Sequence, residues 1–194
     1  MKRIYFILTY TGTILSRVIK IYTGNEFAHV SIALDENLNQ MYSFGRLKPY
    51  NPFVGGFVHE GINIGTFKRF RKTQTEVYSI LISDEQYKKI RKMIKLIGNC
   101  QVAYKFYIMG LFGAGFNIRI QRRHSFYCAE FIRYLLLKAK VKNNLPEIVK
   151  PEDFKKIENI RLEYRGILKN TKLTRSKWTQ WFHKIRLVKN INIE

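Results

Sequence analysis

AHVSIALD, residues 28–35, alternates between apolar side chains and small or polar ones, which is typical of a β-strand with one buried face. His29 opens this strand on the less apolar face, where the neighbouring side chains are small enough to leave space beside a packed helix. Turn-forming residues follow at 36–39, and the run at 40–45 can return as a second strand. The segment therefore predicts a β-hairpin with a histidine at its edge.

FYCAEFIRYLLLKA, residues 126–139, has apolar side chains at helical spacing. Ser125 is a suitable N-cap, so the pattern predicts a helix from about Ser125 to Ala139 with Cys128 at the leading end of its buried face. The free N–H groups and the dipole at a helix N-terminus favour a thiolate, and the same N–H groups can bind an oxyanion. Taken alone, Cys128 has a simpler interpretation as a small buried apolar residue.

His29 and Cys128 together predict a pair of base and nucleophile, because an imidazole can take the thiol proton and later protonate a leaving group. The alternative for His29 is a strand-end histidine held by a hydrogen bond. Cys100 is expected to lie far from both, and two cysteines do not indicate a disulfide framework. No spacing of His, Cys and carboxylates indicates a metal site, and no cofactor is predicted. The remaining histidines lie in loop-like or basic contexts: His59, His124 and His183.

Three segments in this order, SRVIKIYT (16–23), AHVSI (28–32) and YCAEFI (127–132), resemble the circularly permuted NlpC-type papain-fold cysteine hydrolases, the YiiX/YaeF-like group. In that group the histidine strand precedes the cysteine helix, as it does here. The resemblance covers roughly residues 4–157. It implies an α+β, papain-like fold in which an antiparallel sheet or partial barrel packs against the helix that carries the nucleophilic cysteine.

The resemblance assigns Cys128 as the nucleophile and His29 as the base. The third polar residue of the family usually lies on the strand after the histidine strand, which points to Ser43, with Gln40 as the fallback. A serine departs from the acid common there and would orient the imidazole less strongly than a carboxylate. Tyr127, beside the nucleophile, is a candidate for binding the oxyanion or the substrate.

These assignments predict a thiol hydrolase or acyltransferase that acts on an amide or ester bond, with a cell-wall peptide, an acylated small molecule or a lipid as substrate. The alternative is a non-enzymatic binder of anionic surfaces that keeps a vestigial pair. Ser43 and the high charge favour the binder, whereas the intact His29 and Cys128 favour the enzyme.

The formal net charge of the 194 residues is +21, with 35 Lys plus Arg against 14 Asp plus Glu. Such a field favours an anionic membrane or polymer as a partner, although generic solvated charge is an equal alternative. No RRM, KH or zinc-finger signature is present, so no specific nucleic acid is expected.

The chain divides into a permuted papain-like domain, residues 1–168, and a basic, aromatic tail, residues 169–194. In the tail an aromatic stripe with basic flanks predicts either an interfacial helix or a helix docked on the domain. The candidate surface-binding residues are Trp178, Trp181, Phe182, Lys184 and Arg186.

No apolar run is long enough to span a membrane, and the apolar start is too short for a cleaved signal. A cytoplasmic location is therefore expected, with peripheral membrane association as the alternative. Further expected elements follow from periodicity and turn residues. They are strands at 4–9, 76–82 and 161–168, helices at 13–22 and 83–99, and a long loop region at 46–72, with short strands inside it as the alternative.

Overall fold

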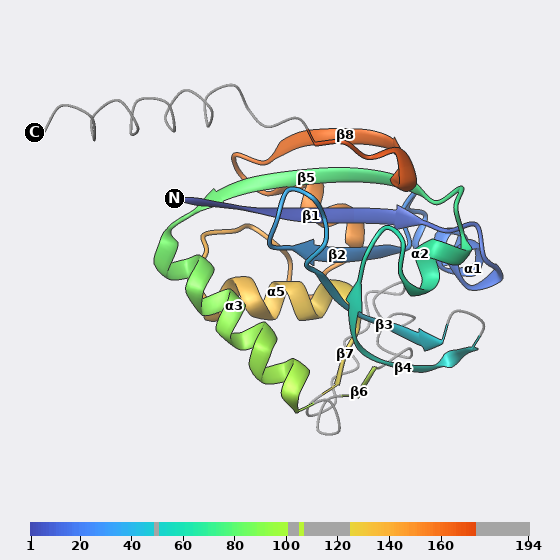
Figure 1. The fold of residues 1–194 in the computed structure, drawn as a ribbon, viewed down its shortest axis with the longest axis horizontal. Coiled ribbons are helices and arrows are strands. Elements are labelled where there is room, and N and C mark those ends of the chain that lie inside the picture. Colours follow the sequence, from blue (N-terminus) through green and yellow to red (C-terminus); the bar gives the residue numbers. More distant parts are fainter. Residues whose placement is uncertain (49–50, 101–104, 107–124, 174–194) are drawn as a thin grey trace, which may run out of the picture.

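A six-stranded antiparallel sheet forms the centre of this computed structural model, which describes residues 1–48, 51–100, 105–106 and 125–173 (Figure 1). The strand order is β4-β3-β2-β1-β5-β8, and each neighbouring pair is antiparallel. The strands are β1 (Lys2–Tyr10), β2 (His29–Ala33), β3 (Met41–Lys48), β4 (Asn51–Glu60), β5 (Gln74–Ile82) and β8 (Arg161–Ile167). A parallel pair, β6 (Lys105–Phe106) and β7 (Ser125–Phe126), lies outside this sheet. The expected α+β class with an antiparallel sheet is confirmed.

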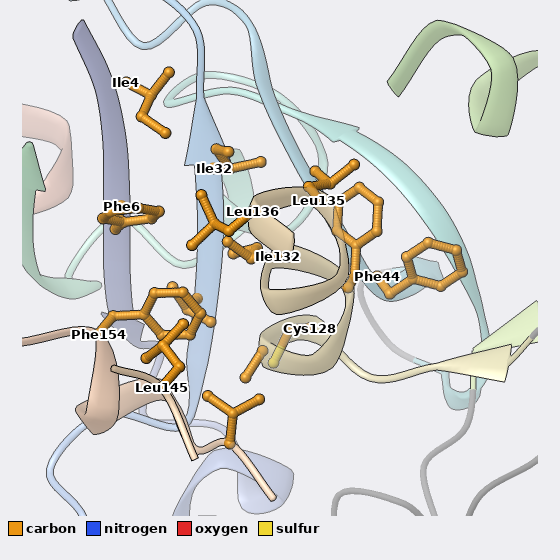
Figure 2. Packing of buried hydrophobic residues seen from close by; sticks show 14 of the residues in the cluster. Ile4, Phe6, Ile32, Phe44, Cys128, Ile132, Leu135, Leu136, Leu145 and Phe154 are labelled. Atoms are coloured by element: carbon orange, nitrogen blue, oxygen red, sulfur yellow. The ribbon is translucent and has the colours of Figure 1, made fainter. Parts of the chain in front are cut away.

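Helices pack against the sheet (Figure 1). The α-helices are α1 (Ile14–Thr23), α2 (Gly65–Arg69), α3 (Asp84–Asn99) and α5 (Cys128–Lys138), with 3-10 helices η2 (Pro151–Lys156) and η3 (Leu168–Asn170). Helix α5 packs on β2 and β3, and α3 packs on α5. Figure 2 shows side chains of α5, such as Ile132 and Leu136, among those of the strands, such as Phe6 and Ile32. These four side chains are fully buried, and the burial of each contributes about 1.5–3 kcal/mol to the stability of the folded state.

The opposite face of the sheet carries a second, smaller cluster of buried apolar side chains. Phe67 of α2 and Leu168 of η3 cover strand residues there, including Ile7 and Met41. Since successive side chains of a strand point to opposite faces, the two clusters explain why β1 is buried along most of its length.

Helix α1 matches the predicted helix in extent but not in the face that it buries. The Thr13 hydroxyl accepts a hydrogen bond from the Ser16 N–H at 3.3 Å, and Gly24 ends the helix in the left-handed conformation at φ 66°. The helix buries Ser16 and Ile19. The apolar residues whose spacing predicted the helix are exposed instead: Ile14, Val18 and Ile21.

Helix α3 and strand β5 agree with their sequence signals. Ser83 and Gln86 form the expected capping box, in which the Ser83 hydroxyl accepts from the Gln86 N–H and the Gln86 side chain accepts from the Ser83 N–H. The strand predicted at 76–82 begins two residues earlier, at Gln74.

Segment 46–72 is mostly regular structure, which corrects the predicted loop region and favours the alternative of strands inside it. Strand β4 and helix α2 both lie in that segment, and β4 pairs with β3 from Met41↔Glu60 to Lys48↔Asn51, with a register shift near Lys48. Proline and glycine suggested irregular chain, but β4 is an edge strand of the sheet. An edge strand tolerates both residues because one side of it needs no ladder hydrogen bonds.

The start of the cysteine helix also differs from the prediction. Helix α5 begins at Cys128, its N-cap is Tyr127, and that cap makes no side-chain hydrogen bond. Ser125 lies in β7 and does not cap the helix. Cys128 is therefore the first helical residue, closer to the free N–H groups than the sequence pattern suggested.

Within the described part of the chain, no helix is long and apolar enough to cross a membrane. The tail residues proposed to bind a surface lie outside the described residues: Trp178, Trp181, Phe182, Lys184 and Arg186.

Candidate active site

His29 is the first residue of β2, at the end of the sheet where β1 finishes. It stands opposite Thr9 in the β1–β2 register, so the sheet fixes its backbone. Gly45 on β3 lies beside the ring, because a Cβ placed on Gly45 would be 3.4 Å from His29 Cε1. The absence of a side chain at Gly45 therefore leaves room for the imidazole between neighbouring strands.

Glu60, the last residue of β4, is the carboxylate partner of His29. The His29 Nε2 atom lies 3.2 Å from Glu60 Oε1 and 3.4 Å from Oε2. The Ser31 hydroxyl donates to Glu60 Oε2 and lies 3.3 Å from His29 Nε2. The side chains of His29 and Glu60 are only 22% and 10% exposed, so water screens this pair weakly.

Cys128 approaches the same imidazole from α5. Its side chain is within hydrogen-bonding reach of His29, and both residues line one cavity. Figure 2 shows Cys128 at the end of α5, among the buried apolar side chains of the main cluster, of which it is a member. Cys128 is buried, with 2% of its surface exposed, and it is one of the residues that line the cavity.

Charge at the site is arranged to keep the imidazole protonated. Burial on its own would lower the pKa of His29, but the Glu60 carboxylate and the Cys128 side chain outweigh it and raise the pKa from 6.5 to about 10. Burial would likewise raise the pKa of Glu60, yet the His29 charge and hydrogen bonds lower it below its usual value. At neutral pH the pair is therefore an imidazolium and a carboxylate.

The cavity beside Cys128 is small, about 60 Å³, which is room for a few water molecules or the narrow end of a substrate. Leu15 and Ile19 supply apolar walls, and Arg46 supplies a cationic one. Burial lowers the pKa of Arg46, whereas the nearby Glu60 carboxylate opposes that shift. The buried Thr9 hydroxyl also lines the cavity and has no hydrogen-bond partner among the described residues.

Ser43, the expected third residue, is close to the pair but does not take the expected role. It is fully buried on β3, and its hydroxyl lies on the same side of the strand as Gly45. It meets no ordinary hydrogen-bond geometry within the described chain, although its proximity still helps to lower the pKa of Glu60. Gln40, the fallback, is exposed and does not line the cavity.

Tyr127 is not placed to bind an oxyanion through its hydroxyl. That hydroxyl donates to the Val149 carbonyl at 3.1 Å, and the residue does not line the cavity. The N–H groups of Cys128 and the next two residues are the first of α5, where no preceding turn supplies acceptors, so they are better oxyanion donors.

The other reactive side chains of the described chain lie elsewhere. Cys100 is exposed at the end of α3 and does not line the cavity, as expected. His59 is 2.9 Å from the Asn39 carbonyl and stacks on Tyr42, which matches a structural histidine. His124 and His183 lie outside the described residues. Among the described residues, no group of three His, Cys, Asp or Glu side chains could hold a metal ion.

Comparison with family models, with curated proteins and with solved structures gives no match to this chain. The site must therefore be interpreted from its own geometry.

Glu60 is the residue of the candidate site that the sequence analysis missed. The resemblance placed the third residue on the strand after His29, whereas the carboxylate comes from one strand further on. A usable signal was present, since Glu60 is the one acid between residues 46 and 72. It passed unnoticed because that whole segment was interpreted as a loop.

Proposed function

We propose that this protein is a cysteine hydrolase or acyltransferase with Cys128 as nucleophile, His29 as acid–base residue and Glu60 as the residue that positions the imidazole. The observation that supports this most directly is the place of His29. Its ring lies between a thiol and a buried carboxylate, beside a cavity that a substrate can enter. This is the three-part arrangement of an activated nucleophile.

The reaction begins with the Cys128 thiolate and the His29 imidazolium. The sulfur attacks the carbonyl carbon of an amide or ester, and negative charge develops on the carbonyl oxygen near the first N–H groups of α5. The imidazolium gives its proton to the leaving amine or alcohol as the bond to carbon breaks. A thioester to Cys128 remains.

The second half regenerates the enzyme. The neutral imidazole takes a proton from water, or from an acceptor alcohol or amine, and the resulting nucleophile attacks the thioester carbonyl. The thiolate leaves, and His29 is again an imidazolium. Because Glu60 already contacts Nε2, the ring nitrogen that exchanges protons with sulfur and substrate is Nδ1.

Glu60 takes the role that the resemblance gave to the third polar residue. A carboxylate holds the ring orientation and stabilises the imidazolium more strongly than a serine hydroxyl can. Ser31 fixes the carboxylate in turn through its hydrogen bond. Ser43 is then a secondary neighbour of Glu60, and its hydroxyl makes no hydrogen bond to the imidazole.

We also propose that the fold is of the permuted NlpC-type, papain-like kind. Three features support this: an antiparallel sheet, a histidine strand that precedes the cysteine helix, and packing of that helix on β2 and β3. The substrate is an amide or ester of a peptide, a small molecule or a lipid, and its reactive end must be narrow enough for the cavity.

The test uses the two cysteines of the same molecule. Full-length protein is treated with limiting iodoacetamide at pH 6–7, and each cysteine is quantified by peptide mass spectrometry. Cys128 should react well before Cys100, and His29→Ala should remove this preference although Cys128 itself is unchanged. Equal alkylation rates for both cysteines in the wild type would overturn the proposed enzymatic function. They would favour the alternative, a surface binder in which His29 and Cys128 are vestigial.

A p-nitrophenyl ester then tests catalysis. A burst of p-nitrophenol with an acyl group on Cys128, absent from Cys128→Ser and present in Cys100→Ser, is the expected result. Cys100→Ser is the matched control because it removes a thiol that does not line the cavity.

A further inference from the structure

Helix α1, which borders the cavity, has an exposed apolar face. Ile14 and Ile21 are 84% and 81% exposed, and Val18 lies between them on the same face. We call these three residues the α1 stripe. The buried side of the same helix supplies Leu15 and Ile19 to the wall of the cavity, so the stripe lies directly outside the site.

Two other elements repeat this arrangement around the cavity. Leu47 follows the cavity residue Arg46 on β3, and Ile64 comes two residues before the cavity residue Thr66 on α2. Each of these two apolar side chains is 51% exposed. Figure 1 shows α1, α2 and the β3–β4 hairpin at one end of the molecule. Three elements that line the cavity therefore each carry exposed apolar residues close in sequence to the lining residues.

Cations accompany the apolar residues. Arg17 and Lys20 flank the α1 stripe and are exposed, and α1 contains no acid. Between residues 46 and 72 the sequence has six Lys or Arg and a single acid, Glu60, which lies in the site. This end of the molecule thus combines apolar side chains with a cationic field.

We propose that the protein docks on an anionic lipid bilayer through this end, with the α1 stripe inserted among the headgroups and acyl chains and the cavity entrance turned toward the membrane. An interfacial helix requires an apolar face flanked by Lys and Arg, and α1 has both. A nucleic acid would need the cations but would gain nothing from exposed isoleucines. A second copy would bring two chains of charge +21 together, which electrostatic repulsion opposes.

The test is co-sedimentation of the full-length protein with vesicles of phosphatidylcholine alone or mixed with phosphatidylglycerol. Binding is expected to be stronger to the mixed vesicles than to phosphatidylcholine alone. Ile14→Ser with Ile21→Ser should weaken it by at least roughly tenfold at both low and high salt, because the inserted apolar area is lost. The matched control, Leu96→Ser with Leu162→Ser, removes exposed apolar residues of α3 and β8, which do not border the cavity, and should bind as the wild type does.

Charge is tested separately. Arg17→Gln with Lys20→Gln should weaken binding by roughly tenfold at low salt and have little effect at 1 M salt, where the Debye length is about 3 Å. Lys89→Gln with Lys92→Gln on α3 removes the same charge from an exposed helix that does not border the cavity and should have a smaller effect.

Several outcomes would overturn the proposal: no binding of the wild type to either vesicle, equal binding of the stripe variant and the wild type, or a dimer that dissociates in the stripe variant by sedimentation velocity. Because Ile14 and Ile21 are exposed, the thermal melt of the variant should match that of the wild type. Alkylation of Cys128 in solution should also be unchanged, so failure of membrane docking is distinguishable from failure of the catalytic assignment.

Discussion

The carboxylates of Glu60 and Glu76 are both shielded from solvent but contact different kinds of groups. Glu60 faces an imidazole, a cavity and a thiol, whereas Glu76 on β5 is enclosed by permanent cations and a phenol. Glu76 is 1% exposed and binds Lys155 Nζ at 2.8 Å, Arg165 Nε at 2.5 Å and the Tyr78 hydroxyl at 2.8 Å. Both carboxylates have a lowered pKa.

The difference lies in what each carboxylate controls. Lys155, whose pKa is raised by its hydrogen bonds to Glu152 and Glu76 against the effect of burial, stays charged across the physiological range. His29 is a titratable imidazole beside the Cys128 thiol, and under the proposed function it gains and loses its proton during the reaction. A lowered carboxylate pKa is therefore no sign of a catalytic site by itself, and the partner decides whether the pair is structural or chemical.

The largest expected effect is that of Cys128→Ser. The rate of p-nitrophenyl ester turnover should fall by about 10⁴-fold or more, because the hydroxyl is a much weaker nucleophile than the thiolate. Stopped-flow absorbance measures it. Lys155→Ala, at the structural pair, should leave the rate per folded molecule unchanged, and an equal loss there would break the distinction between the two regions.

Exchanging each carboxylate for its amide sharpens the comparison. Glu60→Gln should lower ester turnover and the alkylation rate of Cys128 by roughly 10²–10⁴-fold, since the imidazolium loses its stabilising charge. Glu76→Gln should instead lower the free energy of unfolding by about 2–3 kcal/mol, the scale of lost charged hydrogen bonds. Urea denaturation and alkylation kinetics on both variants measure the two effects. If Glu76→Gln slowed alkylation more than Glu60→Gln, the assignment of roles would be reversed.

The two pairs should also differ in pH dependence. The pKa of His29 is raised to about 10, so its contribution to stability is complete below pH 6.5 and is lost as the pH rises through about 10. The stability difference between wild type and Glu60→Gln should therefore shrink between pH 6.5 and 10. The difference between wild type and Glu76→Gln should stay constant there, because the pKa of Lys155 is raised.

Urea denaturation of the wild type, Glu60→Gln and Glu76→Gln at pH 6, 8 and 10 measures these stability differences. The same pH dependence of both differences would contradict the prediction. On the acid side, the pKa of Glu60 is lowered, so the Glu60 contribution is lost only as the pH falls below the usual carboxylate range.

Ser43→Ala should have the smallest effect. Its hydroxyl meets no ordinary hydrogen-bond geometry within the described chain, so alkylation of Cys128 should change by less than about threefold. Ser31→Ala, which removes the hydrogen bond to Glu60, should slow alkylation more. A larger loss of alkylation rate for Ser43→Ala than for Ser31→Ala would favour Ser43 as the third residue of the site.

Much of the fold could be predicted because its signals were local. Thr13 and Gly24 bracket α1, and Ser83 with Gln86 starts α3. Strand β4 could not be predicted in the same way, because its proline and glycine residues indicate a loop until its place at the sheet edge is known. The exposed face of α1 escaped prediction as well, since apolar spacing alone does not say which side of a helix meets the core.

The candidate site was predictable to the extent that each residue carried its own signal. His29 heads an alternating strand and Cys128 opens a helix, so both were found without knowledge of their contact. Glu60 could be assigned to the site only once the pairing of β3 with β4 was known. Because β4 was not predicted as a strand, Ser43 on β3 was assigned as the third residue instead. The hydroxyl of Tyr127 could not be placed because its acceptor, the Val149 carbonyl, is distant in the sequence.

The spacing of the three site residues along the chain has a consequence for biosynthesis. His29 and Glu60 are 31 residues apart and are joined by consecutive antiparallel strands, contacts of short sequence separation that form rapidly. Cys128 belongs to a later part of the chain and meets them only when α5 packs on β2 and β3. Because synthesis proceeds from the N-terminus, the ring and its carboxylate can pair before the sulfur exists. Under the proposed function, a nascent chain whose α5 has not yet packed on the sheet holds no activated thiol.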